Sequence, residues 1–244
     1  MKKYIVTLLL STSLCAIAQP SLTAQSWLIA DDKGNILEGV RTNDVRSIAS
    51  ITKLMTSMVV LDGGQSLTET IPKKLYNRTF TRQELLNLAI IKSDNNAARM
   101  LCEYYPGGIL RCVEAMNNKA NTLGMYRSTF TDPTGLYNTN VSTAEDLIKL
   151  VMAAGNYPAI TSASNTPLIQ WKINKKKSAI FHNTNNLVGK GVDFIVSKTG
   201  WIRDSGGCIV MMLNSDQGIR TVVLLGSKNT KTRIPEAYMV SKLH

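Results

Sequence analysis

Three short motifs follow one another along this chain, and a fold must bring them together if they form one site. They are Ser50-Ile51-Thr52-Lys53, Ser93-Asp94-Asn95 and Lys198-Thr199-Gly200, with about 40 and about 105 residues between successive motifs. Each motif alone occurs by chance in many proteins, but all three in this order and spacing do not. The set therefore favours a fold in which a helix start, a loop and a strand converge.

The first motif has the residues of a serine nucleophile and its base. A serine hydroxyl is a weak nucleophile and needs an adjacent base, and helix positions i and i+3 would place Ser50 beside Lys53. Residues 50–61 have helical periodicity, and Ser47 or Ala49 stands where a cap would be. Ser50 would then lie at a helix N-terminus, which stabilises an oxyanion. The apolar stripe of this helix is Ile51, Leu54, Met55, Met58 and Val59.

The second motif supplies polar groups, and the third supplies a second lysine. Lys53 can act as a base only if burial or a neighbouring cation lowers its pKa, and Lys198 would be that cation if the motifs converge. Ser93 and Asn95 add a hydroxyl and a carboxamide, which suit proton transfer and the binding of a substrate amide. The alternative is that Ser93-Asp94-Asn95 is only a structural cap for the helix that begins near residue 96.

The third motif and the residue after it would bind and polarise the substrate. The Thr199 hydroxyl can donate to a carboxylate, and Gly200 would let an acyl group approach a strand edge closely. The backbone N–H of Trp201 would be a second oxyanion donor beside that of Ser50. Alternatively, Lys198-Thr199-Gly200 is a strand end with a turn glycine, and Ser50 and Lys53 are ordinary helix-surface residues.

The N-terminus differs in character from the rest of this 244-residue chain. Lys2 and Lys3 precede an apolar run and Ala16-Ile17-Ala18, the arrangement of a secretory signal. We predict a signal peptide over residues 1–24, cleaved after 18 or 24, and an exported protein. An uncleaved membrane anchor is the alternative, but the apolar run is short for a membrane span. Residues 25–244 are expected to form one catalytic domain, with enough apolar residues for one sizeable core.

The charge and composition exclude several partners. The formal charge is +11, and loss of Lys2 and Lys3 lowers it to +9, which favours anionic polymers or membrane surfaces. No basic run with interleaved aromatic residues indicates nucleic acid. The three lysines at 175–177 are expected to form a solvated hairpin tip. The alternative is that they contact anionic cell-wall material. The only histidines are His182 and His244, so we expect no metal and no cofactor.

Three cysteines remain after the predicted signal. Cys102 and Cys112 flank a Tyr-Pro-Gly-Gly segment between two helical patterns. In an oxidising compartment they can form a disulfide, and two buried thiols are the alternative. Cys208 lies in an apolar strand pattern and is expected in the core.

The pattern of elements predicts an α+β fold with a mostly antiparallel sheet. A hairpin over 26–40 comes first, and helical patterns then form an inserted lobe over about 83–155. From about 158 to 226 the pattern is that of strands, with turns at 206–207 and 215–218. A closing helix is expected over 230–243. The predicted helices of the lobe are 84–91, 95–104, 108–123 and 144–154, and the predicted late strands are 193–199, 208–213 and 219–225.

Beyond the three motifs, the chain resembles the low-molecular-mass penicillin-binding proteins that are D-alanyl-D-alanine peptidases. The resemblance covers nearly all of residues 25–244 and lies closest to the endopeptidase branch of Gram-negative bacteria. It implies a β-lactamase/transpeptidase-like fold, a periplasmic location, peptidoglycan stem peptides as substrate and β-lactams as covalent inhibitors. The further matching segments are 48–56, 59–62, 105–108, 132–136, 140–144, 183–185 and 198–201.

The resemblance also implies roles for individual residues. Ser50 would be the acylated nucleophile and Lys53 the general base. The other residues that the resemblance assigns are Ser93 and Asn95 for proton transfer and binding, and Lys198 and Thr199 for binding the substrate carboxylate or amide edge.

Two features near the C-terminus bear on which bond is cut and where the protein resides. Arg233 falls where carboxypeptidases of this family place an arginine that grips a free terminal carboxylate. A solvated arginine at a helix start is the alternative. The chain ends soon after the third late strand, so no additional β-domain with an amphipathic anchor is expected.

Two other functions compete with a peptidase. A β-lactamase of this fold would need a deacylating glutamate in an E-x-x-L-N pattern, which is absent, and Glu114 and Glu145 are expected to face solvent. A non-catalytic module that binds penicillin or cell wall is the other alternative. Intact Ser50, Lys53 and Lys198 argue against it.

Overall fold

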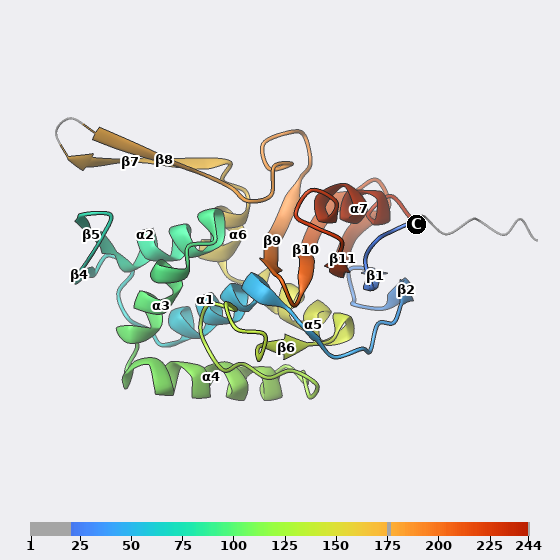
Figure 1. Ribbon diagram of the computed structural model, residues 1–244, viewed down its shortest axis with the longest axis horizontal. Coiled ribbons are helices and arrows are strands. Elements are labelled where there is room, and N and C mark those ends of the chain that lie inside the picture. The colour runs from blue at the N-terminus through green and yellow to red at the C-terminus, as the bar shows by residue number, and fades with distance from the viewer. Residues whose placement is uncertain (1–20, 175–176, 244) are drawn as a thin grey trace, which may run out of the picture.

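A five-stranded antiparallel sheet organises the chain in the computed structural model, which describes residues 21–174 and 177–243 (Figure 1). Its order is β2-β1-β11-β10-β9, so the first two strands pair with the last three and β9 forms one edge. The predicted signal peptide lies almost entirely outside the described residues. The bounds are β1 Ser26–Ala30, β2 Ile36–Val40, β9 Phe194–Ile202, β10 Gly206–Ser215 and β11 Gly218–Ser227.

Alternating side chains of the sheet enter two separate cores. On β10, Ile209 and Met211 pack toward the C-terminal helix α7 (Arg233–Val240), whereas Cys208 and Val210 pack toward the other helices. This period of two is the geometry of a strand that is covered on both faces. Helix α5 (Ala144–Ala154) lies against the sheet face opposite α7 (Figure 1).

The remaining helices and three small two-stranded sheets form the rest of the molecule. The strand pairs are β3 with β6, β4 with β5, and β7 with β8, and the last of these extends over the β4–β5 side of the helices (Figure 1). The remaining helices are η1 Ala49–Ile51, α1 Thr52–Asp62, α2 Arg82–Asn87, η2 Leu88–Lys92, α3 Asn95–Glu103, α4 Gly108–Thr122 and α6 Pro158–Ser164. The short strands are β3 Arg46–Ser47, β4 Thr70–Leu75, β5 Arg78–Thr81, β6 Val141–Ser142, β7 Leu168–Asn174 and β8 Lys177–His182.

The predicted α+β class and its antiparallel sheet are confirmed, and several boundaries are corrected. The 158–226 region is not all strand, because Pro158 at the first helical position begins α6. Gly206 and Gly207 lie within β10 rather than in a turn, and the turn is formed by residues 203–205. The closing helix is α7, which is shorter than the predicted 230–243.

The cysteines resolve the alternative that the sequence left open. Cys102 at the end of α3 and Cys112 in α4 form a disulfide with a Cα–Cα separation of 5.4 Å. Cys208 is a free, fully buried thiol in β10, as predicted. The cluster at 175–177 falls where β7 and β8 join, but residues 175 and 176 are outside the described part of the chain.

Candidate active site

Ser50 lies in a short 3₁₀ turn that leads directly into α1. Neither Ser47 nor Ala49 caps the helix, because no side-chain capping hydrogen bond is present at either start, and Ala49 instead adopts a left-handed φ of 46°. The buried surface of α1 is wider than the predicted apolar stripe, because the helix is buried on nearly all sides and Lys53 is buried with it. The helix is therefore a buried central element, and Ser50 and Lys53 lie at its start.

The Lys53 amine lies among three oxygen atoms. Its Nζ donates to Ser50 Oγ at 2.8 Å, to Asn95 Oδ1 at 2.7 Å and to the Thr134 carbonyl at 2.6 Å. Burial lowers the pKa of Lys53 to about 7, against the opposing influence of the Asp132 and Asp94 carboxylates. Of the two causes predicted from the sequence, burial and the charge of Lys198, burial is the one that lowers this pKa. At neutral pH a large fraction of Lys53 is thus available as a base.

The second motif occupies the junction between two helices. Ser93 ends the π-helix η2 with a left-handed φ of 59°, an uncommon conformation for a residue other than glycine. Asp94 then caps α3, since its carboxylate accepts the Ala97 N–H at 2.9 Å. The motif is therefore a helix cap as well as a convergence point, and Asn95 begins the helix with its side chain on Lys53.

The Lys198 side chain reaches from the edge strand β9 to the second motif. Its Nζ donates to Ser93 Oγ at 2.9 Å and to the Thr199 carbonyl at 2.9 Å. Burial, together with the positive charges of Lys53 and Arg233, holds the pKa of Lys198 well below its usual value. Thr199 Oγ1 donates to Thr184 Oγ1 at 2.6 Å, and Thr184 was not among the predicted site residues.

Gly200 is required by the backbone that it touches. A Cβ at this position would lie 2.9 Å from the Ile48 carbonyl oxygen and 3.0 Å from the Ser50 backbone nitrogen. The space was predicted to admit a bound acyl group, but the backbone of the Ser50 turn itself already requires a glycine here. Trp201 follows on β9 with its side chain half exposed.

Arg233 points inward from the start of α7. Its side chain is 8% exposed and its Nη1 donates to the Gly200 carbonyl at 2.5 Å, while its Nε is buried without a partner. The alternative of a solvated arginine at a helix start is therefore wrong. Because Arg233 also lines the cavity beside Ser50, its guanidinium is suited to binding an anion such as a carboxylate.

The convergent side chains surround a cavity of about 230 Å³. Glu114 and Glu145 do not contribute to it: the former pairs with Arg111 on α4 and the latter accepts from Thr42. The cavity contains all the predicted residues except the two lysines, which lie buried beneath it. Its lining is Ser50, Ser93, Asn95, Thr184, Thr199, Gly200, Trp201, Thr230 and Arg233.

One loop that braces the Ser50 turn was not singled out as functional. It contributes the Thr134 carbonyl to Lys53, and Asp132 shapes it by accepting from the backbone N–H groups of Thr134 and Gly135. Asn140, fully buried, donates to Thr52 Oγ1 and to the Asp132 carbonyl, and thus ties the loop to the start of α1. The sequence signal was present, because this segment was part of the resemblance.

Fold and site together define a class of active-site-serine enzyme in which lysine, not histidine, stands beside the nucleophile. The model of the D-alanyl-D-alanine carboxypeptidase family matches residues 14–75 and 68–229. The chain is 35% identical to a D-alanyl-D-alanine endopeptidase of Pseudomonas aeruginosa, over 90% of this chain and 76% of that one. It is 38% identical to one from Escherichia coli K12, over 80% and 68%. The chain belongs to this family of serine D-alanyl-D-alanine peptidases.

Solved structures agree on the fold. Penicillin-binding protein D2 of Listeria monocytogenes, in its cefotaxime-bound form, superposes with a TM-score of 0.82, at 24% identity over 92% of this chain and 98% of that one. The Streptomyces K15 DD-transpeptidase gives 0.82 at 23% identity with the same coverage. At these identities the likeness concerns the fold alone.

Membrane-spanning helices and metal-ligating clusters were both sought among the described residues. No helix among them is long and apolar enough to cross a membrane. Nor do residues 21–174 and 177–243 contain a group of three or more metal-ligating side chains that could hold a metal ion.

Proposed function

We propose that Ser50 is the nucleophile of this peptidase and Lys53 its general base. One observation carries the proposal: the buried Lys53 amine faces Ser50 Oγ, Asn95 Oδ1 and the Thr134 carbonyl. A neutral amine has two N–H groups and one lone pair. Asn95 and Thr134 accept the two N–H groups, so the lone pair is left to take the Ser50 proton.

The acylation step follows from this arrangement. Ser50 Oγ attacks the carbonyl carbon of a D-alanine residue as its proton passes to Lys53. The backbone N–H groups of Ser50 and Trp201 stabilise the oxyanion. The carbon–nitrogen bond then breaks, the leaving amine takes up a proton through Ser93, and the product is an ester on Ser50. Water hydrolyses this ester in the second half of the cycle.

Lys198, Thr199 and Arg233 bind the leaving side of the substrate. Lys198 and Arg233 supply positive charge, and the Thr199 hydroxyl supplies a donor. Both a terminal D-alanine and a cross-linking diamino acid carry a carboxylate next to the nitrogen that leaves. The same three residues therefore suit carboxypeptidase and endopeptidase cleavage.

Peptidoglycan stem peptides are the substrate class and β-lactams the covalent inhibitors in this proposal. It includes export to the periplasm, with residues 25–244 as one catalytic domain, and the net positive charge suits an anionic polymer. β-Lactams would acylate Ser50 in the same way and leave slowly, since neither Glu114 nor Glu145 lies at the site to activate water.

Mass spectrometry of purified muropeptides tests the proposal, with Ser50→Ala as the control. A cross-linked dimer and a pentapeptide monomer are offered together. Conversion of the dimer to monomers identifies an endopeptidase, and loss of one alanine from the pentapeptide identifies a carboxypeptidase. Activity that persists in Ser50→Ala would refute the nucleophile assignment.

A matched pair of substrates tests Arg233. Arg233→Gln should lower kcat/KM for a peptide with a free C-terminal carboxylate and have little effect on the same peptide as its C-terminal amide. An equal loss on both peptides would mean that Arg233 only supports the Gly200 carbonyl.

A further inference from the structure

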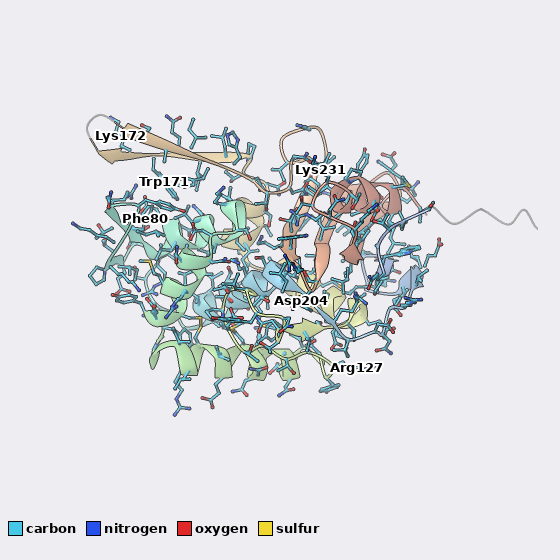
Figure 2. All side chains as sticks on the ribbon, viewed as in Figure 1. Phe80, Arg127, Trp171, Lys172, Asp204 and Lys231 are labelled. Atoms are coloured by element: carbon cyan, nitrogen blue, oxygen red, sulfur yellow. A yellow bond between two sulfur atoms is a disulfide. The ribbon has the colours of Figure 1, made fainter. Side chains whose placement is uncertain are left out.

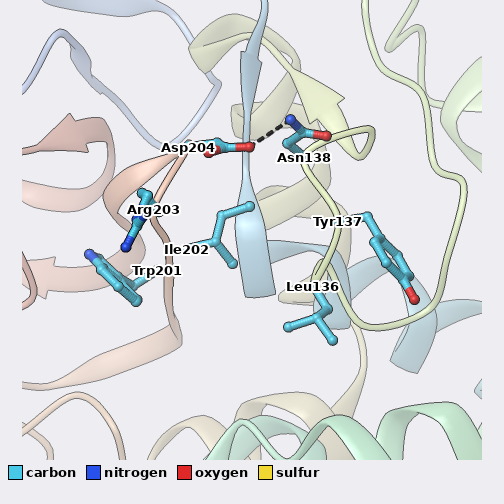
Figure 3. A pocket seen from close by; sticks show the side chains of 7 residues that line it. All are labelled: Leu136, Tyr137, Asn138, Trp201, Ile202, Arg203 and Asp204. Carbon is cyan, nitrogen blue, oxygen red and sulfur yellow. Dashed lines mark hydrogen bonds between the residues drawn. The ribbon is translucent and has the colours of Figure 1, made fainter.

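A second groove, of about 490 Å³, opens beside the Ser50 cavity (Figure 3). One wall is formed by residues 136–138, from the loop that braces the Ser50 turn, and the other by residues 201–204 at the end of β9. Trp201 lines both this groove and the Ser50 cavity. The two spaces are therefore neighbours along the edge of β9, and Asp204 of the groove lies near the middle of the molecule (Figure 2).

Large apolar side chains are exposed along this groove. Leu136 is 53% exposed, Tyr137 63% and Trp201 49%. Clustered exposed apolar side chains with a polar rim mark binding sites more often than chance surface does. Asn138 Nδ2 donates to Asp204 Oδ2 at 2.6 Å, a bond that joins the two walls (Figure 3). This bond links the two walls at one end of the groove.

Two charged side chains of opposite sign, Arg203 and Asp204, line this groove. Arg203 is exposed in the turn after β9, and its guanidinium makes no hydrogen bond or ion pair with any residue of the described chain. The Asp204 carboxylate keeps its negative charge, but it points toward Asn138, whereas Arg203 lies beside Trp201 (Figure 3). A ligand that enters this groove therefore meets apolar walls and one free guanidinium, which binds carboxylates well.

The direction of β9 determines which part of a substrate would reach Arg203. β9 is an edge strand, and a peptide paired antiparallel with its free edge runs opposite to it. If the scissile carbonyl lies between Ser50 and Trp201, the residues before the scissile bond extend toward the end of β9. Arg203 comes two residues after Trp201, about 7 Å farther along at the rise of a strand. That distance suits the side chain of the residue before the acylated D-alanine.

We propose that this groove is a subsite for the residue that precedes the acylated D-alanine, and that Arg203 selects a carboxylate at the end of its side chain. The aliphatic part of that side chain packs on Leu136, Tyr137 and Trp201. Arg203 is a specificity-determining residue in this proposal, which rests on the proposed role of Ser50.

Three synthetic peptides test the subsite. Each is Nα-acetyl-Xaa-D-Ala-D-Ala, where Xaa is 2-aminopimelate, its side-chain amide, or lysine. We expect kcat/KM to be roughly three- to tenfold higher for the carboxylate than for the amide, the range between an exposed and a partly desolvated ion pair. Arg203→Gln should abolish this preference, and Arg203→Glu should favour lysine.

The control is Arg111→Gln, the same chemical change on α4, at a side chain that is 68% exposed. It should keep the wild-type preference. Cleavage of all three peptides without a preference, or a preference that survives Arg203→Gln, would overturn the subsite and leave the proposed function intact. If no peptide and no muropeptide is cleaved, the role of Ser50 fails, and the subsite fails with it.

Discussion

Gly135 is the residue at which one added methyl group should do most damage to the site. It has a left-handed φ of 73°, and a Cβ there would lie 1.9 Å from the Ala49 carbonyl oxygen and 2.4 Å from its carbon. These are backbone atoms of the turn that holds Ser50, so no flexible side chain can move aside. Gly135→Ala must therefore displace either the bracing loop or the Ser50 turn.

Two costs add in this variant. The left-handed conformation costs an alanine about 1–2 kcal/mol, and overpacking in a tight interior typically costs about 1–3 kcal/mol or more. We expect Gly135→Ala to lose about 2–5 kcal/mol of unfolding free energy. Because misplacing a reacting group by about 1 Å can cost about 10²-fold in rate, acylation should fall by at least that factor.

Gly108→Ala is the matched control, because Gly108 has the same φ of 73° and nothing within 4 Å of where the added methyl group would lie. Only the conformational cost of about 1–2 kcal/mol should apply to it. Urea unfolding gives the stability of both variants, and the rate of labelling by fluorescent penicillin gives acylation. Equal losses of stability in the two variants, with normal labelling of Gly135→Ala, would refute the argument from close contact.

Three further predictions concern proton transfer, the disulfide and the second motif. Acylation should increase as pH rises through about 7, the pKa of Lys53, and stopped-flow labelling across pH measures it. In the unfolded chain the pKa of Lys53 is about 10.5, so between about pH 7 and pH 10.5 the unfolded state binds more protons than the folded state. The free energy of unfolding should therefore rise with pH over this range. Replacing both Cys102 and Cys112 by serine should cost about 3 kcal/mol in urea unfolding, because the bridge, with a sequence separation of 10, restricts the unfolded chain; an unchanged midpoint would contradict this. Tyr76→Phe removes the donor to Asp94 and should cost about 1 kcal/mol and lower kcat, whereas a change in KM alone would rule out a positioning role.

Much of the fold could be predicted because apolar runs and helical periodicity both reflect burial. The apolar runs over 208–213 and 219–225 and the helical pattern over 144–154 each correspond to an element of the structure. Pro158 was the missed signal, since a proline favours the first turn of a helix. The β4–β5 hairpin was missed because its two strands are short and polar.

Less of the site's geometry could be predicted. The three motifs indicated which side chains meet, but the Thr134 acceptor is a backbone carbonyl, and any residue type supplies one. The left-handed φ of Ser93 could not be predicted, because glycine and asparagine are the residue types that usually indicate this conformation. The orientation of Arg233 depends on how α7 packs against β10, a long-range contact that no local pattern encodes.

The two buried lysines explain why the site needs its neutral oxygen acceptors. Among the described residues neither Lys53 nor Lys198 forms an ion pair, and each amine donates only to neutral oxygens. Burial disfavours both charges, and Lys53 also opposes the charge on Lys198, so the pair holds fewer than two protons near neutral pH. A substrate carboxylate next to Lys198 and Arg233 would favour the remaining proton on Lys198. The proton deficit would then fall on Lys53, the amine beside Ser50, so that binding of the correct substrate itself would help to prepare the base.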